Sequence, residues 1–128
     1  MRTLATLITI VGALSFPGSA LGHAPKDIAA GFDIEEHLLK VVVTHDTRDA
    51  SKHFVDRIEI KLNGVNILEQ QFASQQDKAV QEAVYRIIDA KVGDKIEVVA
   101  GCNISGRKKA TVTVKKPKPP KEENEQQE

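Results

Sequence analysis

RIEIKLNG, residues 57–64, is the clearest structural signal in the sequence. Apolar and charged side chains alternate strictly over residues 57–62, which is the period of a β-strand with one buried face. The pair Asn63-Gly64 is preferred in two-residue type I′ turns, so the chain is expected to reverse direction there. Residues 65–72 can return antiparallel, and the sequence therefore predicts a β-hairpin.

Four further segments have the composition of short strands. Residues 38–44 are aliphatic and β-branched, which suits a strand buried on both faces. Residues 96–102, which follow a Gly-Asp turn, and residues 110–114 alternate in hydrophobicity, and residues 27–33 are a further candidate.

The segment 79–89 fits two kinds of secondary structure. Its apolar residues recur with helical spacing, whereas Ala83, Tyr85 and Ile87 alternate as they would in a strand. Six short strands separated by turns indicate a sandwich that needs a seventh. We therefore predict a strand here, and an all-β antiparallel sandwich of about seven strands.

Composition narrows the function classes. The chain has 128 residues, enough for one domain, with 18 basic and 18 acidic side chains. Arg2 is the one charge in residues 1–22, so the rest carries 17 basic and 18 acidic groups, a net charge of −1. This balance gives no reason to expect nucleic acid or an anionic membrane surface as a partner. The single cysteine excludes an intrachain disulfide and a zinc site made of cysteines alone.

The two ends differ from the middle of the chain. Residues 1–22 combine a basic start, a short apolar run and a small-residue exit, which is typical of a secretory signal peptide cleaved after Ala20 or Gly22. We therefore expect an exported protein, periplasmic or extracellular, without a membrane anchor after cleavage. Residues 116–128 are charged and proline-rich, which predicts a disordered tail. The folded domain is expected to span residues 23–115.

Candidate metal ligands lie at the ends of predicted strands. His45 and His53 bracket one loop, and Cys102 ends a later strand that can reach the same end of the sandwich. Imidazole nitrogens and a thiolate suit iron, copper or zinc. The alternative interpretation is two solvent-exposed histidines and a buried structural cysteine. His37 is expected to lie about 26 Å from His45 along an extended strand, outside any such site.

His23 precedes the first strand on a segment expected to be flexible, so it is a further candidate ligand. If cleavage made it the N-terminal residue, its amine and imidazole would chelate copper. Three carboxylates near the histidines, Asp46, Asp49 and Asp56, are either orienting partners or ordinary loop residues.

Two blocks of sequence resemble the iron-binding domain of superoxide reductases, the group of neelaredoxin and desulfoferrodoxin. The first is THDTRDASKHFVDRIEIKLNG at residues 44–64, and the second is GCNISG at residues 101–106. The resemblance covers residues 38–114 and implies an immunoglobulin-like β-sandwich. It also implies one non-haem iron, held by four equatorial histidines and an axial cysteine, which reduces superoxide to hydrogen peroxide with electrons from a small donor protein.

Carried over by motif, the resemblance makes His45 and His53 equatorial ligands and Cys102 the axial thiolate. His23, which lies outside the matched motifs, is the candidate for a fourth ligand. Ser105 stands where the family has a histidine after Cys-Asn, so the site is expected to be degenerate, with reduced or lost superoxide reduction. The competing hypothesis is a non-enzymatic β-sandwich binding module, similar to the SoxZ sulfur-carrier-binding proteins. That hypothesis leaves Cys102 without a role.

Overall fold

The computed structural model describes residues 22–120, which form seven strands and no helix. Every pair of neighbouring strands is antiparallel. The expectation of an all-β protein of about seven strands is confirmed. The strands are β1 (Asp27–Asp33), β2 (Leu38–Thr44), β3 (Val55–Leu62), β4 (Val65–Gln71), β5 (Val80–Arg86), β6 (Lys95–Cys102) and β7 (Arg107–Thr113).

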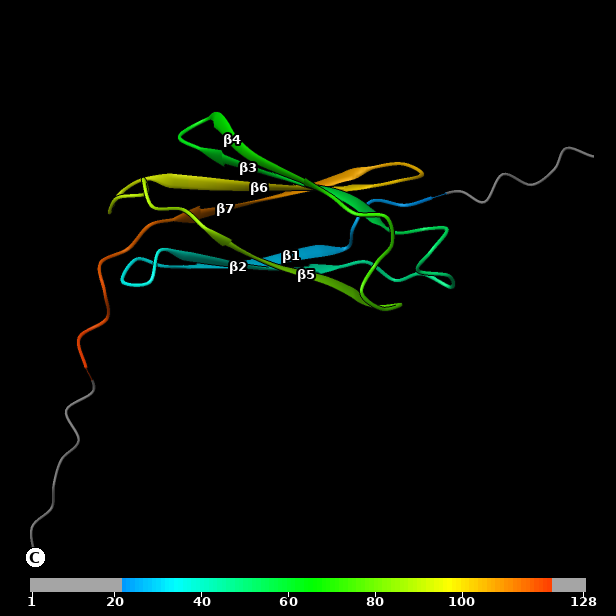
Figure 1. Ribbon diagram of the computed structural model, residues 1–128, viewed down its shortest axis with the longest axis horizontal. Coiled ribbons are helices and arrows are strands. Elements are labelled where there is room, and N and C mark those ends of the chain that lie inside the picture. Colours follow the sequence, from blue (N-terminus) through cyan, green and yellow to red (C-terminus); the bar gives the residue numbers. More distant parts are fainter. Residues whose placement is uncertain (1–21, 121–128) are drawn as a thin grey trace, which may run out of the picture.

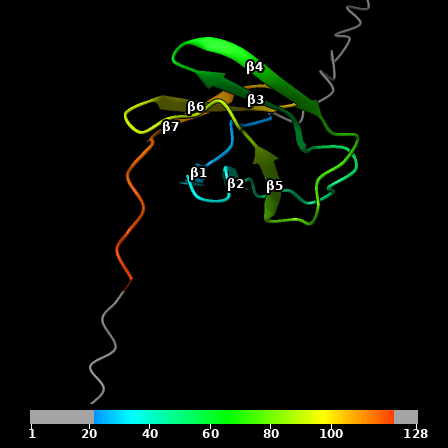
Figure 2. The ribbon, with the colours of Figure 1, turned by 60° about the vertical axis from the view of Figure 1, so that its left-hand side comes forward.

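The strands form two sheets that pack face to face (Figures 1 and 2). One sheet has the order β1-β2-β5 and the other has the order β4-β3-β6-β7. This arrangement corresponds to the A-B-E and C-F-G groups of an immunoglobulin sandwich, with the fourth strand paired to the third instead of the fifth. Strands β1 and β7 lie close together and close one side of the sandwich.

The β3–β4 hairpin forms as the Asn-Gly pair predicts. Asn63 and Gly64 have φ values of 50° and 85°, the positive pair that a type I′ turn requires. Alternate residues of β3, including Ile58 and Ile60, are fully buried, while Glu59 and Lys61 face outward. The strict alternation of the sequence therefore sets which face of this strand enters the core.

The core is aliphatic and is shared by both sheets. Strand β2 contributes Leu39, Val41 and Val43, each at most 1% exposed, and β6 contributes Ile96 and Val98. Burial of each such side chain stabilises the fold by roughly 1.5–3 kcal/mol. Packing of these strands in the core also fixes the positions of the loops that follow them, and these loops carry the candidate ligands.

The ambiguous segment is a strand, as predicted from the strand count. Strand β5 pairs with β2 over seven residues, and its inward face includes Tyr85. Val84 points the other way and is 59% exposed, which explains why the apolar residues imitate a helical spacing. The last strand, β7, begins at Arg107 and is longer than the predicted range 110–114, because its lysine-rich start pairs with β6.

The expected signal peptide (1–22) lies outside the described residues except for Gly22, and residues 121–128 of the expected tail lie outside them as well. Residues 114–120 are described and contain no strand. Within residues 22–120, no helix is long and apolar enough to cross a membrane.

Candidate metal centre

Four segments meet at one end of the sandwich, the right-hand end in Figure 1. They are the chain before β1, the β2–β3 loop, the β4–β5 loop and the β6–β7 turn. Because β2 ends and β3 begins at this end, His45 and His53 lie on the same side of the molecule, as the sequence predicts. His37 lies in the β1–β2 turn at the opposite end.

Three histidines converge here. One ring nitrogen from each of His23, His45 and His53 lies within 4.8 Å of the other two. The ring centroids are 4.6 Å apart for His45 and His53, 4.8 Å for His23 and His45, and 4.9 Å for His23 and His53. We call these residues the histidine cluster. Such an arrangement can hold one metal ion, and three imidazoles suit iron, copper or zinc.

His45 is the buried member of the cluster, with no exposed surface. It directly follows β2, and its backbone N–H donates to the carbonyl of Ala79 at 2.9 Å. Its Nδ1 lies 2.9 Å from Oε1 of Gln75, and its Nε2 lies 3.3 Å from the carbonyl oxygen of His23. Both neighbouring atoms are acceptors, so a neutral His45 ring can donate to only one of them.

His53 is held through its neighbours in the chain. The Asn103 side chain accepts a hydrogen bond from the Phe54 N–H at 2.8 Å and donates to the Lys52 carbonyl at 2.9 Å. One amide thus braces the backbone on both sides of His53. The carbonyl of Asp49 also accepts the His53 N–H at 3.0 Å, closing a turn within the loop.

His23 is exposed, but the residues on either side of it contact the β6–β7 turn. Ser105 Oγ donates to the Gly22 carbonyl at 2.9 Å. Gly106 has a φ of 90°, and a Cβ there would lie 2.7 Å from Ala24. The backbone of Gly106 is therefore in close contact with the backbone of Ala24. These contacts hold the residues on both sides of His23.

The surroundings of His53 disfavour its protonated form. Burial lowers the pKa of His53 below 6.5, and the neighbouring charges of His45 and His23 lower it further. The Nε2 atom of His53 is buried and has no hydrogen-bond partner. A buried nitrogen without a partner is costly unless something binds it, and a metal ion between the three rings would use it. The residues present therefore fit a metal.

Cys102 lies at the same end but outside the histidine cluster. It is the last residue of β6, is 9% exposed, and is a free cysteine. Its Sγ accepts the Ile104 N–H at 3.4 Å. Its neighbour Asn103 braces His53, so the Cys-Asn pair of the sequence motif is structurally joined to the cluster.

The orienting partner of His45 is an amide, not a carboxylate. Asp49, one of the three candidates in the sequence, instead binds Ser51 and lies 3.8 Å from Lys52. Sequence reasoning missed Gln75, because a glutamine in a polar loop carries no local signal of burial. The role of Gln75 becomes visible only in the structure, where the β4–β5 loop contacts His45.

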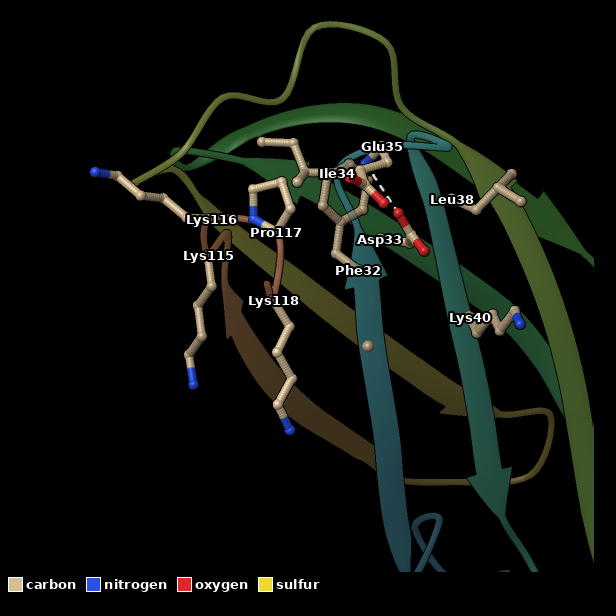
Figure 3. Close-up of a pocket in the computed structure, with 11 residues that line it drawn as sticks. Phe32, Asp33, Ile34, Glu35, Leu38, Lys40, Lys115, Lys116, Pro117 and Lys118 are labelled. Carbon is tan, nitrogen blue, oxygen red and sulfur yellow. Dashed lines mark hydrogen bonds between the residues drawn. The ribbon is translucent and has the colours of Figure 1, made fainter. Parts of the chain in front are cut away.

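A hollow of about 580 Å³ opens onto the cluster. It is lined by His23, His53, Ile104 and residues 46–49, which include Arg48 and the carboxylates of Asp46 and Asp49. A second hollow, of about 460 Å³, lies at the opposite end between the β1–β2 turn and the chain after β7 (Figure 3). Its walls present lysines together with Asp33 and Glu35, but no histidine or cysteine. The ligand-bearing end is therefore the candidate site.

No family model matches the chain, and no curated protein matches it. Among solved structures, the chain is similar to the superoxide reductase (1Fe-SOR) from Giardia intestinalis, with a TM-score of 0.54. The two sequences are 13% identical, and the match covers 72% of this chain and 100% of that chain. At this identity the similarity shows a shared fold.

Proposed function

We propose that the histidine cluster binds one iron ion in a site of the superoxide reductase type. The observation that carries the proposal is the convergence of three imidazole nitrogens within 4.8 Å of one another. Nε2 of His53 is in addition buried and has no hydrogen-bond partner. The family resemblance makes Cys102 a ligand, although it lies outside the cluster at the same end of the sandwich, and it makes ligands of two cluster members, His45 and His53. The third, His23, completes a set of three imidazoles.

The proposed site has fewer histidines than the family pattern. The hydroxyl of Ser105 donates to the Gly22 carbonyl, so this residue supports the chain beside His23 instead of binding metal. Bound iron would supply one electron to superoxide, which becomes hydrogen peroxide by also taking up two protons from the solvent. With a neutral hydroxyl replacing an imidazole, we expect weaker iron binding and slower superoxide reduction than in a complete site.

A hollow of about 580 Å³, with His23 and His53 in its lining, gives a small substrate a route to the cluster. The same lining carries one cation, Arg48, and two carboxylates, Asp46 and Asp49, so it provides no excess of positive charge. Cys102 is buried, and its sulfur accepts a hydrogen bond from the Ile104 N–H. We expect superoxide to reach the cluster through this hollow, with a small donor protein supplying electrons.

Anaerobic loading of the purified protein with ferrous iron tests the proposal. We expect about one iron per chain, and after oxidation a visible absorption band that Cys102→Ala removes. His45→Ala should abolish binding, while His37→Ala, at the other end of the molecule, should not change it. If the wild type binds no iron, or if His45→Ala and His37→Ala bind equally, the proposal is wrong. A stable protein partner without bound metal would then favour the binding-module hypothesis.

We also propose that the protein is exported. Sequencing the N-terminus of the protein recovered from the periplasm or medium tests this. Cleavage after Ala20 or Gly22 is the expected result, and retention of Met1 would contradict it.

A further inference from the structure

The side chain of Gln75 is almost fully buried, at 5% exposure, and its amide is surrounded by four polar groups. Its Nε2 donates to two carbonyls, those of His45 at 2.7 Å and Asp77 at 2.9 Å. Its Oε1 accepts the Val55 N–H at 3.1 Å and lies 2.9 Å from Nδ1 of His45. Every hydrogen-bonding direction of this amide is therefore used.

These contacts permit one orientation of the amide. Rotating it by half a turn would place Oε1 against two carbonyl oxygens and its N–H groups against the Val55 N–H. Oε1 must therefore face His45. Because an amide oxygen only accepts hydrogen bonds, the 2.9 Å contact is filled when Nδ1 of His45 carries the hydrogen. Nε2 also faces an acceptor, the His23 carbonyl, but at the longer distance of 3.3 Å, so the contact with Gln75 is the stronger of the two.

We infer that Gln75 is a positioning residue that selects the His45 tautomer with the hydrogen on Nδ1, leaving the Nε2 lone pair for a ligand of the histidine cluster. The inference rests on the proposed function for the identity of that ligand. A neutral imidazole has one donor and one acceptor nitrogen, and the partner of one nitrogen decides the state of the other. Gln75 takes the place that a carboxylate or backbone carbonyl occupies behind many metal-binding histidines.

The geometry also explains why a glutamine suits this position. An aspartate or glutamate would accept from Nδ1 but would place negative charge against the carbonyls of His45 and Asp77. The amide satisfies both requirements, because it accepts on one side and donates twice on the other. Gln75 therefore links the tautomer of His45 to the conformation of the β4–β5 loop, through its hydrogen bonds to the His45 and Asp77 carbonyls.

Two variants separate the accepting role from the structural role. Gln75→Glu and Gln75→Met both lose the two donated hydrogen bonds, so urea unfolding should show a loss of stability in both. Only Gln75→Met also loses the acceptor for Nδ1. Long-range ¹H–¹⁵N correlation spectra of the metal-free protein, at a pH where the imidazoles are neutral, report which nitrogen of His45 carries the hydrogen. Co²⁺ titration, followed by visible absorption, reports metal affinity.

We expect His45 to carry its hydrogen on Nδ1 in the wild type and in Gln75→Glu, and to become a mixture of tautomers in Gln75→Met. We expect Gln75→Met to bind Co²⁺ about 10–100-fold more weakly than the wild type, with Gln75→Glu closer to the wild-type value. A hydrogen on Nε2 in the wild type, an unchanged tautomer in Gln75→Met, or equal loss of Co²⁺ affinity in both variants would overturn the inference. If the wild type binds no Co²⁺, the metal proposal fails, and the spectra of the metal-free protein still decide the tautomer.

Discussion

Gly106→Ala should weaken metal binding by displacing His23, although residue 106 is not itself a ligand. A Cβ at this position would lie 2.7 Å from three atoms of Ala24, two of them in the backbone. Restoring an ordinary contact of 3.4 Å requires a movement of about 0.7 Å. A binding constellation must be held to within about 0.5 Å of its productive geometry, so this movement is enough to disturb the cluster.

Gly93→Ala is a matched control. Gly93 has a φ of 93°, close to the 90° of Gly106, but a Cβ there would meet nothing within 4 Å. Both variants therefore force alanine into a positive φ, which costs about 1–3 kcal/mol of stability. Only Gly106→Ala also pushes on the chain beside His23.

Urea unfolding and Co²⁺ titration of both variants measure the two effects separately. We expect similar losses of stability from the positive φ, with an additional loss in Gly106→Ala from the contact with Ala24. Metal affinity should fall by about tenfold or more in Gly106→Ala, equivalent to about 1.4 kcal/mol, and should stay near the wild-type value in Gly93→Ala. Equal affinity in the two variants would refute the reasoning, because His23 would then either not be a ligand or not be held by this contact.

Three further predictions concern the other supports of the cluster. The pKa of His53 is lower in the folded protein than the usual 6.5, so the unfolded state binds the proton more readily. The free energy of unfolding of the metal-free protein should be highest above pH 6.5 and should decrease as the pH falls from there through the pKa of His53 in the folded state. The midpoint of urea unfolding, measured against pH, should show this decrease. His53→Gln should make the midpoint less dependent on pH. Asn103→Ala removes two hydrogen bonds to the backbone around His53. It should lower stability by about 1–2 kcal/mol and should also lower metal affinity. The control Asn66→Ala, at an exposed position of β4, should leave metal affinity unchanged. Ser105→Ala removes the hydrogen bond to the Gly22 carbonyl, worth about 0.5–1.5 kcal/mol, and should weaken Co²⁺ binding; an unchanged Co²⁺ affinity would show that this contact does not support His23.

The sequence predicts the fold well because the signals for strands are local. The alternation around Ile58 and Ile60 and the Asn63-Gly64 turn specify one hairpin without reference to the rest of the chain. Segment 79–89 needed the strand count, because the exposed Val84 obscures the period of β5. In that case an argument about the whole sandwich corrected the local pattern.

The site is only partly predictable from the sequence, for a physical reason. His45 and His53 come together because two neighbouring strands end at the same edge of the sandwich, which the strand order implies. His23 joins them through contacts with the β6–β7 turn, such as the hydrogen bond from Ser105, 83 positions along the chain from Gly22. Contacts at that separation leave no periodic trace in either segment.

The contacts of the polar residues around the cluster help to explain the difference between this site and the family pattern. Each histidine of the cluster is supported by a side chain from another segment: Gln75 for His45, Asn103 for His53, and Ser105 beside His23. A site that had merely lost a ligand would leave residue 105 without a role. Instead its hydroxyl fixes the segment that bears the third imidazole, and the neighbouring glycine allows that segment to pack closely. The serine therefore fits a three-histidine site held together by its surroundings better than a four-histidine site with one position vacant.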